Sequence, residues 1–286
     1  GVLLILKQMP HLVGHDTDPV GDMAFEQPDG DTTFTAIETA MESVLPGAAL
    51  VGLVCFSLLL IWPKTPLAKS LFPAPLAAVL LGVAINEILV ANGSALAITS
   101  THLVGVPVVG VDGATWSDVL VMPDFARIDD PAIWLAAITI AIVASLETLL
   151  NLDATDRLDP KKRHSPPNRE LVAQGVGNTL SGVIGGLPMT SVIVRSSVNA
   201  QSGATTRLSA ITHGLLLLGS VALLPELLNR IPLSSLAAIL IVTGFKLASP
   251  QVFRALWKQG ISQFIPFVIT ILAIVYTDLL VGVIIG

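Results

Sequence analysis

Two polar residues interrupt the apolar run 133–152 at a spacing that suits ion binding. A carboxylate such as Glu147 costs about 3 kcal/mol at the centre of a membrane helix, so such residues usually face a cavity. Asn151 follows at i+4 and shares a helix face with Glu147. The pair predicts a position that binds a coupling cation or balances a nearby charge. The alternative is a structural hydrogen bond between helices.

A second candidate site lies where glycine and proline break the apolar pattern, in the region 185–202. Pro188 cannot continue a helix from before it, and Thr190 or Ser191 is a good N-cap for a helix that starts there. Unpaired N–H groups and the positive dipole end would then attract an anion. Arg195 adds a full positive charge on the same element. Alternatively, Arg195 pairs with a carboxylate for stability alone.

These residues need long apolar helices to position them. Of the 286 residues, 52% are hydrophobic and 13% are charged, about half the charge of a soluble domain. Continuous runs of about 20 residues predict membrane-spanning helices. Both ends are apolar, which suggests a piece of a longer chain. The predicted runs are 45–62, 71–90, 133–152, 171–186, 208–228, 233–247 and 264–276.

The charges divide between the two sides of the predicted membrane. Alternating the connecting loops places eleven of the fifteen basic residues on one side, which is therefore cytoplasmic. The other side carries two long acidic loops, 11–42 and 90–130. The basic residues are Lys64, Lys69, Arg157, Lys161, Lys162, Arg163, Arg169, Arg207, Lys246, Arg254 and Lys258.

For the loops to alternate in this way, the segments 171–186 and 185–202 must each enter the membrane as a short or partial span. Together they would cross it outward and return. Short segments interrupted by glycine and proline are the best sequence indication of a transporter binding site. Irregular backbone is tolerated at that depth only against protein or a water-filled cavity. The alternative is a kinked packing helix.

The same region resembles a known family. The stretch 185–208 is similar to the sulfate permease (SulP) family, with Pro188, Thr190, Arg195 and the run 198–204 matching its motif around the tenth helix. Further matches to the eighth and ninth helices fall at 145–149, 168–171 and 174–182.

The resemblance implies an all-α membrane protein with two inverted repeats of seven segments, divided into core and gate domains. This chain would cover roughly the fifth to fourteenth segments, without the third helix or the family's STAS domain. Residues 1–128 would be mostly gate-side segments and external loops, 129–207 core segments with a half-helix site, and 208–286 the remaining segments.

The resemblance also implies residue roles. The anion would lie at the N-terminus of the tenth helix, and a cation near the eighth. The implied substrate-binding residues are Pro188, Thr190, Ser191, Val192 and Arg195, and the implied coupling-ion residues are Glu147 and Asn151. Many members have a Ser-Phe-Ser type run before the arginine, whereas this chain has Ser-Val-Ile-Val at 191–194. Anion selectivity therefore does not carry over.

The expected function is a secondary transporter of a small inorganic anion, sulfate or bicarbonate, in the inner (plasma) membrane. Transport would be coupled to Na⁺ or H⁺, or would exchange anions, and a homodimer is possible. A nucleobase permease and an anion channel of the same architecture remain open alternatives. The sequence has no H-E-x-x-H pair or G-x-S-x-G elbow, scattered histidines and a single cysteine. We therefore expect no enzyme activity, metal site, cofactor or nucleic-acid partner.

Overall fold

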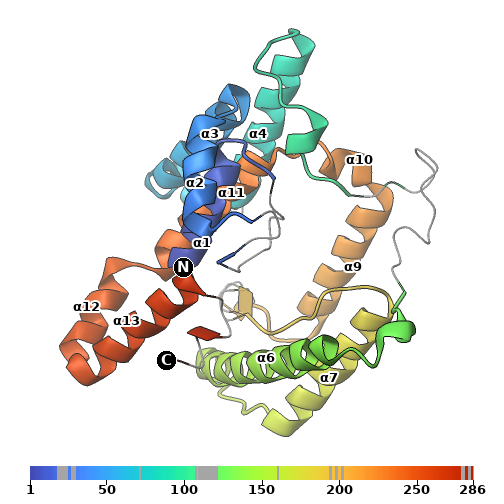
Figure 1. The fold of residues 1–286 in the computed structure, drawn as a ribbon, viewed down its shortest axis with the longest axis vertical. Helices are drawn as coiled ribbons and strands as arrows, with labels where there is room; N and C mark the ends of the chain where they lie inside the picture. Colours follow the sequence, from blue (N-terminus) through green and yellow to red (C-terminus); the bar gives the residue numbers. More distant parts are fainter. Residues whose placement is uncertain are drawn as a thin grey trace. The chain divides into compact units, whose positions relative to one another are not determined.

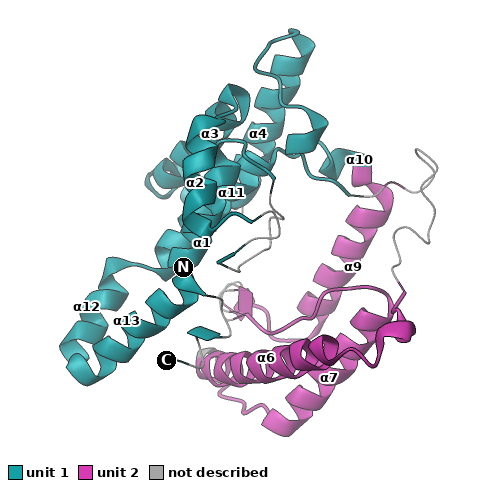
Figure 2. Ribbon diagram, in the orientation of Figure 1, with its two compact units in different colours: residues 1–106, 226–286 teal, residues 107–225 magenta. Residues whose placement is uncertain are grey.

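The fold was analysed in a computed structural model of the chain. Contacts divide it into two compact units, residues 1–106 with 226–286 (unit 1) and residues 107–225 (unit 2), coloured separately in Figure 2. Unit 2 contains the predicted core stretch 129–207, and the predicted three-part division stays a prediction. The structure describes residues 1–17, 25–26, 30–70, 72–106, 108, 122–159, 161–192, 195–196, 199–200, 203–277, 281–282 and 285.

Within these residues the regular structure is helical, and the predicted all-α class is confirmed (Figure 1). Unit 1 contains α1 (Val2–Leu12), α2 (Thr33–Glu42), α3 (Pro46–Ile61), α4 (Ala74–Ala91), α11 (Leu233–Leu247), α12 (Pro250–Gln259) and α13 (Ile261–Tyr276). Unit 2 contains α6 (Pro131–Leu158), α7 (Pro167–Val183) and α9 (Leu208–Leu223), and the short α10 (Pro225–Leu228) lies at the boundary.

Four helical stretches in the described part of the chain are long and apolar enough to cross a membrane. They are Pro46–Lys64, Ala74–Ala91, Pro131–Arg157 and Leu233–Gln259. The multi-pass membrane prediction is confirmed by these stretches. Residues 107 and 109–121 of the predicted loop 90–130 fall outside the described residues.

Small residues allow the helices of unit 1 to pack closely. A Cβ atom on Gly52 of α3 would lie 2.5 Å from the backbone oxygen of Leu12 at the end of α1. A Cβ on Gly82 of α4 would lie 2.9 Å from the Cβ of Ser235 in α11. Membrane helices use such residues because lipid offers no hydrophobic force between helices, so close van der Waals contact must hold them.

The core of unit 1 lies between α3, α4 and α11. Val51, Cys55 and Ala78 are fully buried there, together with Ala238. The Cys55 thiol donates a hydrogen bond to the backbone oxygen of Ala78, 3.2 Å away. The single cysteine is therefore a packing residue.

Two segments predicted as loops contain helices. The acidic loop 11–42 ends in α2, which Thr32 and Thr35 begin with a capping box. The basic segment after residue 247 contains α12, which begins with Pro250 at its first position. Both loop predictions are wrong, because each of these short helices has a charged face and one apolar face, so no continuous apolar run marks it.

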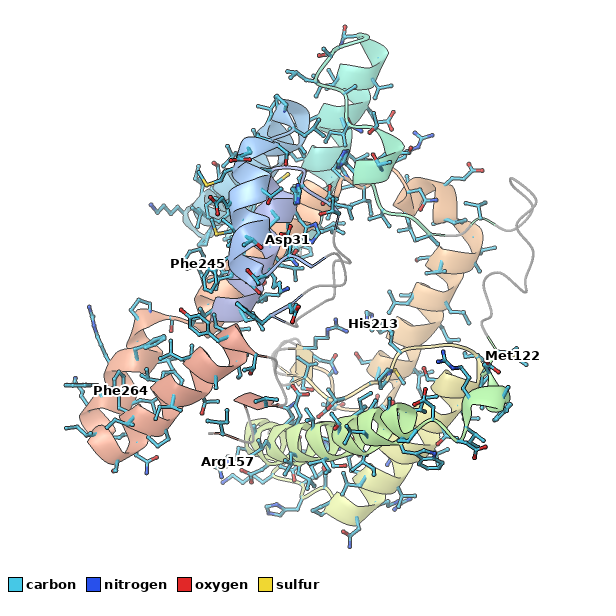
Figure 3. The ribbon with its side chains drawn as sticks, in the orientation of Figure 1. Asp31, Met122, Arg157, His213, Phe245 and Phe264 are labelled. Carbon is cyan, nitrogen blue, oxygen red and sulfur yellow. The ribbon has the colours of Figure 1, made fainter. Side chains whose placement is uncertain are left out.

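The short helices α2 and α12 lie at opposite ends of α13. At its start, Phe264 stacks edge-on against Trp257 of α12, with ring centroids 4.9 Å apart (Figure 3 labels Phe264). At its end, Tyr276 lies against Phe34 of α2, with ring centroids 5.7 Å apart. A helix with the 16 residues of α13 is about 24 Å long, close to the ~30 Å hydrocarbon core.

α6 and the start of α7 extend beyond the predicted runs, whereas α9 ends at Leu223, short of the predicted end at residue 228. α6 continues to Leu158, six residues beyond the predicted run 133–152. α7 begins at Pro167, four residues before the apolar run starts at Leu171. Asp130 caps α6 by accepting a hydrogen bond from the backbone N–H of Ala132. Because the polar ends of membrane helices project into water, the length of the apolar run underestimates the length of the helix.

Candidate functional site

The predicted site is built around an extended segment, residues 186–192, which follows α7. α7 ends in a Schellman motif: Gly185 has a φ of 79°, its N–H donates to the oxygen of Gly182, and the N–H of Gly186 donates to the oxygen of Ser181. Pro188 follows within the extended segment and prevents helix from resuming there. The glycine and proline residues thus interrupt the helix where the sequence predicts an interruption.

Side chains of α7 hold the backbone at Met189. The Asn178 amide donates to the oxygen of Met189 at 2.9 Å and accepts from its N–H at 2.8 Å. Gln174 donates to the same oxygen at 2.9 Å. Asn178 thereby satisfies both backbone polar groups of Met189, which lies outside any helix. These α7 residues were not predicted as site residues, although 174–182 was noted as part of the family motif.

Side chains of α6 hold the next two residues of the extended segment. The Thr190 hydroxyl shares a hydrogen bond of 3.0 Å with the buried Thr148 hydroxyl and donates to the oxygen of Ala144 at 3.3 Å. The Asn151 amide donates to the oxygen of Ser191 at 2.5 Å. Asn151, which was predicted to help bind a coupling ion, therefore also fixes the backbone of the predicted anion site.

The helix that contains Arg195 begins later than predicted. Residues 186–192 are not helical, and the N–H of Ser196 donates to the oxygen of Val192 in the first helical bond that the structure describes. Thr190 and Ser191 therefore do not act as its N-cap, because the Thr190 hydroxyl bonds to α6 and the Ser191 hydroxyl has no hydrogen-bond partner among the described residues. Arg195 lies in the first turn.

This helix is short. Gly203 has a φ of 90° and ends it with a second Schellman motif, in which Ala204 donates to the oxygen of Asn199. The ten residues between Val192 and Gly203 allow at most about 15 Å of helix, half of a bilayer core. Its N-terminus can thus lie at mid-membrane depth.

The two charged residues of the site have no ion-pair partners within the described part of the chain. Arg195 and Glu147 are both exposed. The alternative in which Arg195 pairs with a carboxylate finds no support there. The Ser191 hydroxyl is buried and has no hydrogen-bond partner among the described residues. A charge and a hydroxyl are therefore available for a ligand.

An open cavity of about 840 Å³ lies at the C-terminal end of α6. Its wall includes Arg163, Arg207 and Ser196, the residue after Arg195. Arg163 forms an ion pair with Asp159 at 2.7 Å, and its hydrogen bonds hold the pKa of that carboxyl well below its usual range. The cavity therefore lies between the C-terminal end of α6 and the residues Ser196, Asn199 and Ala200 that follow Arg195.

Sequence reasoning missed a histidine cluster in unit 1. Asp16 is buried, and its two carboxylate oxygens lie 2.6 Å from Nδ1 of His11 and 2.7 Å from Nδ1 of His102. The cluster joins the end of α1 to the chain after α4. His11 and His102 are far apart in the sequence, so no local pattern could have revealed the cluster.

The sequence and fold were compared with known proteins. The chain is 25% identical to the bicarbonate transporter BicA of Synechocystis over 286 residues, which is 100% of this chain and 46% of BicA. It is 34% identical to the sodium-independent sulfate anion transporter of Bos taurus over 105 residues, or 37% of this chain and 17% of the bovine protein. The chain thus spans less than half the length of these relatives.

The solved transmembrane domain of a cyanobacterial BicA has a similar fold. Its TM-score is 0.67 at 24% identity, covering 99% of this chain and 65% of that chain. The model of the family described as "Sulfate permease family" matches residues 1–271. This is a family of transporters, as expected for a chain predicted not to be an enzyme. The chain belongs to the sulfate permease family.

Proposed function

We propose that this chain is the part of a secondary transporter that binds a small inorganic anion, of the sulfate or bicarbonate class, at the start of the Arg195 helix. One observation carries the proposal. Side chains of α6 and α7 fix an extended segment that precedes a short helix, and the arginine in the first turn of this helix has no ion-pair partner among the described residues. Fixed N–H groups, a helix dipole and a guanidinium then act on one position.

The anion class follows from this chemistry and from the relatives. The unpartnered hydroxyl of Ser191 and the guanidinium of Arg195 both donate hydrogen bonds, which suits the oxygens of sulfate or bicarbonate. The names of two relatives refer to these anions: BicA is named a bicarbonate transporter, and the bovine protein is named a sulfate anion transporter. A nucleobase permease would instead need paired carboxylates, and Glu147 is the one acidic residue among the predicted site residues.

A coupling cation would bind beside Glu147. This carboxylate is unpaired in the described residues, and Asn151 uses its amide nitrogen on Ser191, which leaves its oxygen directed elsewhere. A Na⁺ ion or a proton here would balance the carboxylate, and the Asn151 bond links the cation position to the anion backbone. Binding of one ion would therefore favour binding of the other.

Alternating access would expose this position to each side of the membrane in turn. The open cavity lined by Arg163 and Arg207 supports the cytoplasmic route, because its polar wall, which also includes Asp156, Asp159 and Glu170, reaches Ser196 beside Arg195. A homodimer is part of the same proposal. Cross-linking in the membrane would test it.

The test is uptake of labelled sulfate and labelled bicarbonate by the protein in proteoliposomes, with a Na⁺ gradient, a proton gradient or neither. Saturable uptake of one anion under one gradient is expected. Arg195→Ala should raise the KM for the anion about 10- to 100-fold, the loss of a charged hydrogen bond. Glu147→Gln should weaken the cation dependence more than the anion affinity.

Matched controls exist in unit 1. Glu87 and Arg230 pair with each other at 3.6 Å, and both are exposed. Glu87→Gln and Arg230→Ala make the same changes of charge and should leave both parameters unchanged. Unchanged anion affinity in Arg195→Ala would make this arginine structural, and intact cation dependence in Glu147→Gln would remove its coupling role. Nonsaturable flux would favour a channel.

A further inference from the structure

α12 is an amphipathic helix with a sharp division of its residues. At 100° per residue, Phe253, Leu256 and Trp257 fall on one side, and Arg254 and Lys258 fall on the other. The apolar side packs on α13, where Phe253 contacts Phe267 with ring centroids 5.2 Å apart. Trp257 remains 60% exposed. A helix of this kind typically lies in the membrane interface rather than across the bilayer, so that within the stretch Leu233–Gln259 the crossing part would be α11.

The position of α12 agrees with an interfacial location. It contacts the start of α13, whereas α2 contacts the end of the same helix, about 24 Å away. The two short helices therefore lie near opposite surfaces of the membrane. α2 carries Glu38 and Glu42 without a basic residue, and α12 carries Arg254 and Lys258 without an acidic one. By the positive-inside rule, α12 lies on the cytoplasmic side.

The basic side of α12 is open. Arg254 and Lys258 are one turn apart, both are exposed, and neither pairs with a carboxylate within the described residues. Lys246, in the last turn of α11, is exposed as well. Two unpaired cations beside a half-exposed tryptophan match the chemistry of a lipid surface, in which phosphate groups lie directly above the acyl chains.

We propose that α12 binds the headgroups of anionic phospholipids in the cytoplasmic leaflet. Arg254 and Lys258 would donate hydrogen bonds to the lipid phosphate, while Trp257 lies among the first acyl carbons. Each basic residue near an anionic leaflet contributes about 1 kcal/mol, or about fivefold in affinity. Because α12 packs on α13, bound lipid would also fix the start of that helix. This inference is independent of which anion is transported.

The experiment measures which lipids surround Trp257. The protein is reconstituted in phosphatidylcholine vesicles containing phosphatidylglycerol, and one of the two lipids carries bromine on its acyl chains to quench tryptophan fluorescence. The signal of Trp257 is the quenching that is lost in Trp257→Phe. The ratio of quenching by brominated phosphatidylglycerol to that by brominated phosphatidylcholine reports the local preference. We expect this ratio to favour phosphatidylglycerol and to fall at high salt.

The variant Arg254→Gln with Lys258→Gln should reduce that preference about 25-fold, at about fivefold per residue. Lys161→Gln with Lys162→Gln removes the same charge from an exposed connector predicted on the same side and should change nothing. Lys258→Gln alone should show about a fivefold loss if the double variant does not fold. An unchanged ratio in the α12 variants, an equal loss in the control, or displacement by inorganic phosphate would each overturn the proposal.

Discussion

The two units hold their helices together by different forces. In unit 1, small and apolar side chains such as Val51, Cys55, Ala78 and Ala238 are completely buried between helices. In unit 2, α7 and α9 bury no residue, and Thr148 of α6 is buried against Thr190. The order of unit 2 instead comes from side chains that bind the backbone of the extended segment. Close packing gives unit 1 rigidity, whereas hydrogen bonds give unit 2 a defined site.

The largest expected effect tests the packing of unit 1. Gly52→Ala would force α1 and α3 apart, because the added methyl would overlap the oxygen of Leu12. Overpacking of this kind costs about 1–3 kcal/mol. In unit 2, Gly175→Ala has no atom within 4 Å to meet and should be neutral or slightly stabilising. Thermal unfolding in detergent measures both. Equal losses in the two variants would contradict the difference between the units.

The next effect tests the hydrogen bonds of unit 2. Asn178→Ala removes both bonds to Met189 and should lower anion affinity about 10- to 30-fold, at about 1 kcal/mol per bond. Gln174→Ala removes a single bond and should cost less. Uptake kinetics in proteoliposomes measure these changes. Normal anion affinity in Asn178→Ala would show that the site does not depend on the hydrogen bonds between Asn178 and Met189.

One cluster in unit 1 is held by polar contacts rather than by apolar packing. Asp16→Asn keeps the shape of the side chain but weakens its bonds to His11 and His102, and should cost about 1–2 kcal/mol at neutral pH. Thermal unfolding should show this loss, and cross-links between residues near positions 11 and 102 should form more slowly. His164→Gln, on an exposed histidine, is the control. A loss no larger than in the control would reduce the cluster to a surface contact.

The smallest effect concerns the connector of unit 2. Arg163 lowers the pKa of Asp159, so this interaction contributes at neutral pH and is lost as the pH falls below the ordinary range of an aspartate. Asp159→Asn should speed hydrogen exchange at the backbone amide of Arg163, which donates to this carboxylate at 2.9 Å. The difference from the natural chain should shrink towards acidic pH. A difference in exchange rate that grows towards acidic pH would contradict a lowered pKa of Asp159.

The long apolar helices and the break near Pro188 could be predicted, because hydropathy and backbone chemistry are local properties. The start of the Arg195 helix could not, because Thr190 bonds to Thr148 of another helix. α12 was predictable in principle from the spacing of Phe253, Leu256 and Trp257 against its two cations. The His11–Asp16–His102 cluster depends on tertiary packing over long sequence distances.

The hydrogen bonds to the extended segment reach mainly its backbone. Asn178, Gln174 and Asn151 bind peptide groups, while the side chains of Leu187 and Met189 are 83% and 57% exposed. These side chains can therefore be exchanged during evolution without loss of the bonds that position the chain. A scaffold of this kind tolerates side-chain substitution along the segment while the path of its backbone stays constant.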